Sequence, residues 1–174
     1  MKQLTAFYYC HSLRLSDYDY SGNGAYFITF CSDNKQSLFG EIVNGEMILN
    51  VFGMIVQEEL SKTPDIRHEI ELITCCVMPN HIHAIILLAG AQGDRPVAPT
   101  STTTLRPKSI GAFVAGFKSA VTKRINGTRN TPGVPVWQRN YYEHVIRDDA
   151  DMSKIHDYIK ANPTRWMEGE EQLE

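Results

Sequence analysis

The stretch HEIELITCCVMPNHIHAIILLAG (residues 68–90) decides the fold, because it holds two strand-like segments and the turn between them. Residues 68–78 and 81–90 are rich in apolar and β-branched residues, which favour strands. Pro79 and Asn80 separate the two segments and are typical turn residues. The sequence therefore predicts an antiparallel pair of strands, around which the other elements can be placed.

The residues before this pair predict a strand, a hairpin and a helix. Residues 24–32 are aromatic and β-branched, which favours a strand. Residues 41–49 carry Asn44-Gly45 between short apolar pieces, a strong hairpin signal. Residues 50–63 space their apolar side chains in a helical pattern, and we expect this helix to end at Pro64.

The residues after the pair predict two helices with an extended segment between them. Residues 109–127 form an amphipathic pattern, with Gly127 as the expected C-terminal stop. Residues 134–147 read as a strand or extended segment. Residues 148–162 carry acids in their first turn, and Pro163 would follow the end of this last helix.

This order of elements predicts an α+β fold with a ferredoxin-like, RRM-like antiparallel sheet and helices packed on one face. We expect a single domain over residues 23–166, preceded by an N-terminal arm (1–22) and followed by an acidic tail (167–174). Residues 89–107 are rich in proline and threonine, and we expect a flexible connection there.

The composition is that of an ordinary soluble domain. The chain has 174 residues, of which 43% are hydrophobic and 21% charged. The N-terminal region has no apolar core of a signal peptide, and the longest apolar run is too short to cross a bilayer, so we expect a cytoplasmic protein without a membrane segment. None of the four cysteines forms a CxxC pair, and Cys75 and Cys76 would face opposite sides of a sheet. Reduced thiols are expected rather than a disulfide or a structural zinc site.

The charges are distributed unevenly along the chain. The formal net charge is −3, yet residues 101–147 hold eight basic residues against one acidic residue, a net of +7. The remainder holds nine basic and nineteen acidic residues. This asymmetry predicts a continuous phosphate-binding face, with a solvated helix face and an acidic tail as the alternative. The candidate phosphate contacts are Arg14, Lys118, Lys123, Arg124 and Arg139.

Two histidines, His81 and His83, stand at the start of the second strand of the pair. Residues two apart on a strand point to the same face, so the two imidazoles would lie close enough to hold one metal ion. A single histidine at such a position would more often be a hydrogen-bonded core residue. Two histidines at this spacing indicate metal binding as strongly as they indicate a role as hydrogen-bonded core residues.

The last helix offers a nucleophile and a further ligand. Tyr158 and Asn162 are four residues apart and share a helix face. They border an apolar stripe that would pack on the sheet, formed by Met152, Ile155 and Ile159. Without the histidines, Tyr158 would be interpreted as an amphipathic residue at the core margin and Asn162 as a helix end before Pro163.

Four segments together resemble the REP-associated tyrosine transposases, which belong to the single-tyrosine HUH superfamily. PNHIHAII (79–86) resembles the HUH motif of a histidine, a bulky hydrophobic residue and a histidine. WQRNYYEHVIRD (137–148) and DYIKANP (157–163) resemble the C-terminal half of these proteins. RLSDYDYSGNGAYFITFCS (14–32) resembles their opening, and the resemblance covers about residues 14–166.

The resemblance implies a role for each matching residue. His81 and His83 match the metal-ligating histidines, Tyr158 the nucleophilic tyrosine, and Asn162 the polar residue that completes the metal site. It also implies Mg²⁺ or Mn²⁺ as cofactor and single-stranded DNA, usually folded into a hairpin, as partner. Relatives are monomers or homodimers, so the oligomeric state is open.

The function implied is a metal-dependent single-stranded DNA transposase or endonuclease. Tyr158 would attack phosphorus, giving a 5′-phosphotyrosine and a free 3′-OH, and the covalent link would let the strands be rejoined. One alternative is a domesticated protein that binds DNA hairpins without strand transfer. Another is a small metal-dependent phosphoesterase in which Tyr158 is structural. Four further residues are candidate rivals or helpers of these groups, namely Tyr141, Tyr142, His144 and His156.

Overall fold

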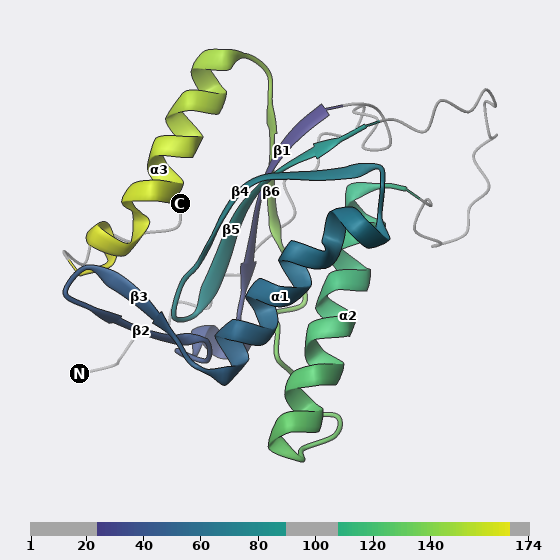
Figure 1. Ribbon diagram of the computed structural model, residues 1–174, viewed down its shortest axis with the longest axis vertical. Helices are drawn as coiled ribbons and strands as arrows, with labels where there is room; N and C mark the ends of the chain where they lie inside the picture. The colour runs from purple at the N-terminus through teal and green to yellow at the C-terminus, as the bar shows by residue number, and fades with distance from the viewer. Residues whose placement is uncertain (1–23, 90–107, 168–174) are drawn as a thin grey trace, which may run out of the picture.

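A four-stranded antiparallel sheet forms the centre of the molecule, shown in Figure 1 for a computed structural model that describes residues 24–89 and 108–167. The strand order is β4-β5-β1-β6, and every neighbouring pair is antiparallel. This is the order of a ferredoxin-like sheet, so the predicted α+β class is confirmed. The strands are β1 (Gly24–Cys31), β4 (Ile70–Val77), β5 (His81–Leu88) and β6 (Tyr142–Ile146).

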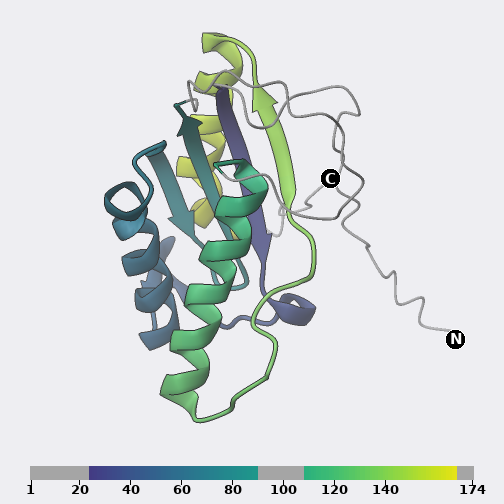
Figure 2. The ribbon, with the colours of Figure 1, turned by 90° about the vertical axis from the view of Figure 1, so that its right-hand side faces the viewer.

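The three long helices cover both faces of this sheet. Helices α1 (Val51–Ile66) and α2 (Ile110–Arg129) lie on one face, and α3 (Asp149–Met167) lies on the other (Figures 1 and 2). The expectation that all helices pack on one face is therefore wrong for α3. The reason is that both faces of the sheet carry large apolar side chains, and each must be covered.

The alternation of side chains along β5 separates these two faces. Ile82, Ala84 and Ile86 belong to the large core under α1 and α2, which we call the α1–α2 face. Ile85 belongs to a smaller cluster with residues of α3, which we call the α3 face. Because the side chains of a strand alternate with a period of two, His81 and His83 lie on the α3 face.

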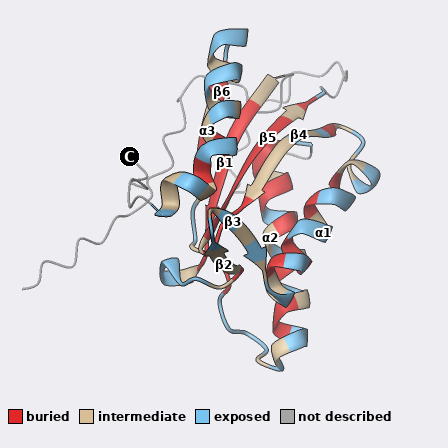
Figure 3. Ribbon diagram, turned by 60° about the vertical axis from the view of Figure 1, so that its left-hand side comes forward, coloured by how far each residue is buried: buried red, intermediate tan, exposed pale blue. Residues whose placement is uncertain are grey.

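The buried residues concentrate in the central strands and on the sheet-facing sides of the helices, as Figure 3 shows. On the α3 face, β1 contributes Phe27, β6 contributes Ile146 and α3 contributes Ile159. The predicted stripe of Met152 and Ile155 packs beside them. The α3 face therefore has a short apolar core at one end and polar side chains at the other.

A separate hairpin lies between β1 and α1, as the sequence predicts. Its strands are β2 (Gly40–Val43) and β3 (Glu46–Leu49). Asn44 and Gly45 both have positive φ angles, 52° and 81°, as the favoured two-residue hairpin turn requires. This hairpin also contacts α3. A short 3-10 turn, η1 (Asp33–Lys35), follows β1.

The predicted ends of all three helices need correction. Helix α1 continues through Pro64 and α3 continues through Pro163, although a proline inside a helix costs about 3 kcal/mol. Helix α2 passes Gly127 and is capped by Asn130 in the left-handed conformation, whose N–H binds the last carbonyls. Tertiary packing decides these ends. The extra turn of α3 carries Trp166, which packs beside His81.

Several expectations fall on residues outside the described ranges, including the N-terminal arm with Arg14 and nearly all of the connection and tail. No disulfide joins Cys31, Cys75 and Cys76 to one another within those ranges, and Cys75 and Cys76 pack on opposite faces as predicted. None of the described helices is long and apolar enough to cross a membrane.

Candidate active site on the α3 face

The two histidines of β5 meet through their Nε2 atoms. The Nε2 of His81 lies 3.0 Å from the Nε2 of His83. His81 exposes 1% of its surface and His83 none, so the pair is enclosed by protein. Two ring nitrogens that point at the same place can act together, by sharing a proton or by holding one ion.

The far nitrogen of each ring has its own partner. The Nδ1 of His81 lies 2.7 Å from Oδ1 of Asn80, and the Nδ1 of His83 lies 2.8 Å from Oγ1 of Thr29 on the neighbouring strand. Burial, and to a smaller extent His81, holds the pKa of His83 well below its usual range. The His83 imidazole is therefore neutral and keeps a lone pair for a ligand.

Helix α3 presents three side chains to this pair, spaced four residues apart. The ring of Tyr158 lies 5.3 Å from that of His83, and the ring of Trp166 lies 6.0 Å from that of His81. Asn162 is 1% exposed, and its spacing on the helix places it between these two residues on the same face. The helix thus brings Tyr158 to the two histidines, although the chain separates Tyr158 from His83 by 75 residues, and the spacing directs Asn162 toward the same place.

The side-chain oxygen of Asn162 is a candidate metal ligand. This Oδ1 atom is buried and has no hydrogen-bond partner among the residues that the structure describes. An unpaired buried oxygen costs about 1–3 kcal/mol, which is a reason to look for a missing partner. A cation that accepts an amide oxygen and two imidazole nitrogens would satisfy it.

The histidine pair fits such a cation. Two neighbouring ligands of an octahedral ion, each about 2.1 Å from it, lie about 3.0 Å apart. The Nε2–Nε2 distance of 3.0 Å matches this separation. Among residues 24–89 and 108–167, no group of three His, Cys, Asp or Glu side chains could hold a metal ion. The buried side-chain oxygen of Asn162 is the candidate for a third protein ligand.

A cation from the last turn of α3 lies over the tyrosine. The Cζ atom of Arg165 is 5.5 Å from the centre of the Tyr158 ring. A guanidinium at this distance is attracted to the face of the ring. We did not predict Arg165 or Trp166 from the sequence, because both follow Pro163, where we expected the helix to have ended.

The other aromatic and histidine candidates take different places. Tyr141 packs on the α1–α2 face, 6.2 Å from Phe30 between ring centres, as a core residue would. Tyr142 lies on the α3 face, where burial, helped by Asp151, raises its pKa. His144 Nε2 lies 2.8 Å from a carboxylate oxygen of Asp151, which ties β6 to the first turn of α3.

The sequence also did not predict the contacts of Thr29 and Asn80 with the two histidines. Thr29 is 54 residues from His83 and reaches it only through the pairing of β1 with β5. Asn80 looks like a turn residue in the sequence. Knowledge of the strand register would have revealed Thr29, because Thr29 and His83 are directly opposite one another.

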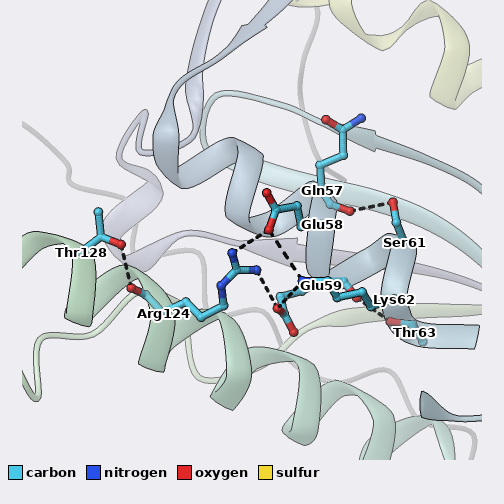
Figure 4. A network of polar contacts seen from close by, with 8 residues as sticks. All are labelled: Gln57, Glu58, Glu59, Ser61, Lys62, Thr63, Arg124 and Thr128. Atoms are coloured by element: carbon cyan, nitrogen blue, oxygen red, sulfur yellow. Dashed lines mark hydrogen bonds and ion pairs between the residues drawn. The ribbon is translucent and has the colours of Figure 1, made fainter. Parts of the chain in front are cut away.

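Those of the predicted basic residues that the structure describes do not form one face leading to the histidines. Lys123 and Arg124 lie on α2, across the sheet from α3. Arg124 donates to Glu58 at 2.6 Å and to Glu59 at 2.7 Å, as Figure 4 shows. These carboxylates already neutralise its charge, so the expectation of a continuous face is wrong here.

Two other basic candidates occupy different surroundings. The Nζ of Lys118 donates to the backbone carbonyls of Gln138 and Asn140, at 2.9 and 2.8 Å. This links α2 to the segment that leads into β6. Arg139, in that segment, is exposed. A DNA contact by Lys118 or Arg139 remains a prediction.

Comparison with known proteins identifies relatives that span most of the chain. No protein-family model matches it. An uncharacterized protein of Haemophilus influenzae is 37% identical over 161 residues, covering 89% of this chain and 88% of its own. A second protein of that organism, named "Putative REP-associated tyrosine transposase", is 27% identical over 152 residues, covering 84% of this chain and 74% of its own.

The fold also matches a solved structure. The structure of a REP-associated tyrosine transposase bound to a REP hairpin covers 87% of this chain and 74% of its own, with a TM-score of 0.52 and 20% sequence identity. At this identity, the match shows that the two chains share a fold.

Proposed function

Because the chain belongs to the REP-associated tyrosine transposases, we propose that it cuts and rejoins single-stranded DNA through a covalent bond to Tyr158. One observation carries the proposal. Tyr158 packs against a buried histidine pair whose Nε2 atoms meet at 3.0 Å, and one turn further along the same helix face Asn162 has a buried oxygen with no hydrogen-bond partner among the described residues. A packing role alone would not require this combination of polar groups in a sheet interior.

We propose DNA folded into a hairpin as the substrate. The solved relative is bound to a REP hairpin, which supports the same class of partner for this chain. The strand next to the hairpin would present the phosphodiester to Tyr158. The DNA sequence that is cut is a separate question, to be answered by scanning substrates.

The chemical step is a transfer of the phosphodiester from DNA to tyrosine. The phenol oxygen of Tyr158 forms a bond to phosphorus and loses its proton, while the bond from phosphorus to the 3′ oxygen breaks and that oxygen gains a proton. The products are a 5′-phosphotyrosine and a free 3′-OH. Attack by another 3′-OH reverses the step and joins the strands.

The residues around Tyr158 would have distinct tasks. His81, His83 and Asn162 would hold Mg²⁺ or Mn²⁺, which supplies charge neutralisation at the scissile phosphate. Arg165 would favour the phenolate form of Tyr158, since the unperturbed pKa of tyrosine is about 10. Because the donor set contains two imidazoles, Mn²⁺ suits it better than Mg²⁺.

Access to this site requires motion. His81, His83 and Asn162 each expose at most 1% of their surface, so a phosphate can reach them only if the side chains over them move. Tyr158 and Trp166 are two of these side chains. We therefore propose that DNA binding displaces part of α3 from the sheet.

The test is formation of a denaturation-resistant adduct between the purified protein and labelled hairpin oligonucleotides in the presence of Mn²⁺. Wild-type protein should form the adduct, and Tyr158→Phe should form none while binding the same hairpins. Tyr142→Phe is the matched control, since it removes a hydroxyl from the same face and should leave the adduct intact.

The outcomes separate three functions. Tight binding of hairpins without any adduct would favour a DNA-binding protein that no longer transfers strands. Metal-dependent cleavage that persists in Tyr158→Phe would favour a phosphoesterase. An adduct that persists in Tyr158→Phe would show that another residue is the nucleophile.

A further inference from the structure

The partners of the two histidines differ in what they can donate and accept. Asn80 uses its side-chain nitrogen to donate to the carbonyl of Lys35, at 3.3 Å, so its oxygen faces His81. An amide oxygen only accepts, and the Nδ1 of His81 must therefore carry a proton. Thr29 meets His83 with a hydroxyl, which can either donate or accept.

The contact between the two histidines then determines which Nε2 atom carries the proton that lies between them. A distance of 3.0 Å between two Nε2 atoms indicates a hydrogen bond, so one of them carries a proton. In the uncharged pair, His81 already has its proton on Nδ1. The shared proton must therefore sit on Nε2 of His83, which leaves the Nδ1 of His83 to accept from the Thr29 hydroxyl.

A metal-binding pair needs a different arrangement. Both Nε2 atoms must then present lone pairs, so His83 must carry its proton on Nδ1 instead. The ring loses one proton at Nε2 and gains one at Nδ1 by exchange with water, and its charge is unchanged. Thr29 must then accept from His83, and its hydroxyl can do so by rotating.

We propose that Thr29 is a positioning residue that stabilises both tautomers of His83, whereas Asn80 holds His81 permanently in the tautomer that binds metal. This inference rests on the proposed function, because it assigns Thr29 a role in loading the metal site of the transposase. Both partners of the Thr29–His83 bond are buried, with 2% and 0% exposure, so water cannot easily replace the hydroxyl.

The first test reads the tautomers directly. Nitrogen NMR of ¹⁵N-histidine-labelled protein, metal-free and at a pH where imidazole is neutral, should show His81 protonated on Nδ1 and His83 on Nε2. Adding one equivalent of Zn²⁺, a diamagnetic ion that binds imidazole, should move the His83 proton to Nδ1 and leave His81 unchanged. Finding His83 protonated on Nδ1 before any metal is added would overturn the inference.

The second test measures Mn²⁺ affinity by calorimetry. Thr29→Val keeps the shape of the side chain but removes the hydroxyl, and should weaken Mn²⁺ binding by about 10–100-fold, as the loss of an outer-shell partner does. The metal-bound state loses more than the metal-free state, because it would keep a buried N–H of His83 without an acceptor, whereas the metal-free state would keep only an unpaired lone pair. Thr29→Ser should restore affinity to within a few fold. Thr63→Val is the matched control, because Thr63 is also a buried threonine, with its hydroxyl on the Glu59 carbonyl of α1, and should bind as wild type does.

The two tests distinguish this inference from the proposed function. If Thr29→Val binds Mn²⁺ as well as Thr63→Val does, Thr29 has no positioning role, while the transposase function stands. If wild-type protein binds no Mn²⁺ at all, the metal site is refuted, and so is the role of Thr29 as hydrogen-bond acceptor for metal-bound His83. The metal-free NMR spectrum still decides whether Thr29 donates to His83 when no metal is bound.

Discussion

The two faces of the sheet are built to different rules. On the α1–α2 face, β5 contributes only apolar side chains, which join one large core. On the α3 face, the same strand contributes two buried histidines before its first apolar residue, Ile85. Burying polar groups is costly unless they are paired, and on the α3 face the Asn162 oxygen remains unpaired. The α1–α2 face contributes stability, whereas the α3 face carries buried polar groups that lower stability and that we propose to serve in catalysis.

The largest contrast between the faces should be in activity. His83→Ala removes a proposed ligand and should slow adduct formation by about 10³-fold or more, because a bound ion supplies several kcal/mol of transition-state stabilisation. Binding of the hairpin should persist, as measured by fluorescence anisotropy. Full activity in this variant would remove His83 from the proposed site.

The opposite substitution on the same strand should affect stability instead. Ile86 is fully buried on the α1–α2 face, and Ile86→Ala should lower the free energy of unfolding by about 2–5 kcal/mol through lost burial and a cavity. At a temperature where this variant is folded, its rate of adduct formation should equal that of wild type. Urea denaturation measures the free energy of unfolding, and the adduct assay measures the rate. A large loss of rate would mean that the two faces are not separable.

Two buried asparagines, Asn126 of α2 and Asn162 of α3, provide a further comparison between paired and unpaired polar groups. Asn126 donates to the Val134 carbonyl and accepts from Arg129, so Asn126→Leu should lower the free energy of unfolding by about 1–3 kcal/mol. Asn162→Leu changes the side chain's shape as Asn126→Leu does, but it removes an oxygen that has no partner among the described residues. It should raise the free energy of unfolding of the metal-free protein by about 1 kcal/mol. Mn²⁺ affinity should fall only in Asn162→Leu. Equal destabilisation by both substitutions would show that Asn162 is a structural residue.

The smallest expected effects concern two arginines. Arg165→Ala should slow adduct formation by about 10-fold, since a cation over an aromatic ring contributes about 1–2 kcal/mol. Arg124→Ala breaks two ion pairs near the surface between α1 and α2. It should change the free energy of unfolding by less than about 1 kcal/mol and leave the rate of adduct formation unchanged. A lower rate of adduct formation in Arg124→Ala would indicate that DNA binds on the α1–α2 face.

The sequence predicted the strands, their antiparallel pairing and the proximity of His81 and His83, because these depend on local patterns. It could not predict that α3 continues past Pro163, since packing of the last turn beside His81 outweighs the local penalty of proline. For the same reason, Arg165 and Trp166 were missed. Thr29 was missed because its contact with His83 depends on strand register, which no local pattern encodes.

Charge patterning was the least reliable guide. The basic residues of segment 101–147 cluster in the sequence, but the fold gives those in its described part different surroundings. Arg124 is neutralised by Glu58 and Glu59 on α1, and Lys118 binds backbone carbonyls near β6. A count of charges along the chain does not reveal which of them the fold pairs.

The most direct measurement is to map the residue that becomes linked to DNA. Wild-type protein would be trapped with a hairpin oligonucleotide and Mn²⁺, digested with protease and nuclease, and analysed by mass spectrometry. The nucleotide should be attached to the peptide that contains Tyr158, and its yield should fall to background when Mn²⁺ is chelated. Attachment to Tyr142, or a nucleotide yield that chelation does not change, would contradict the assignment of the α3 face as a metal-dependent active site.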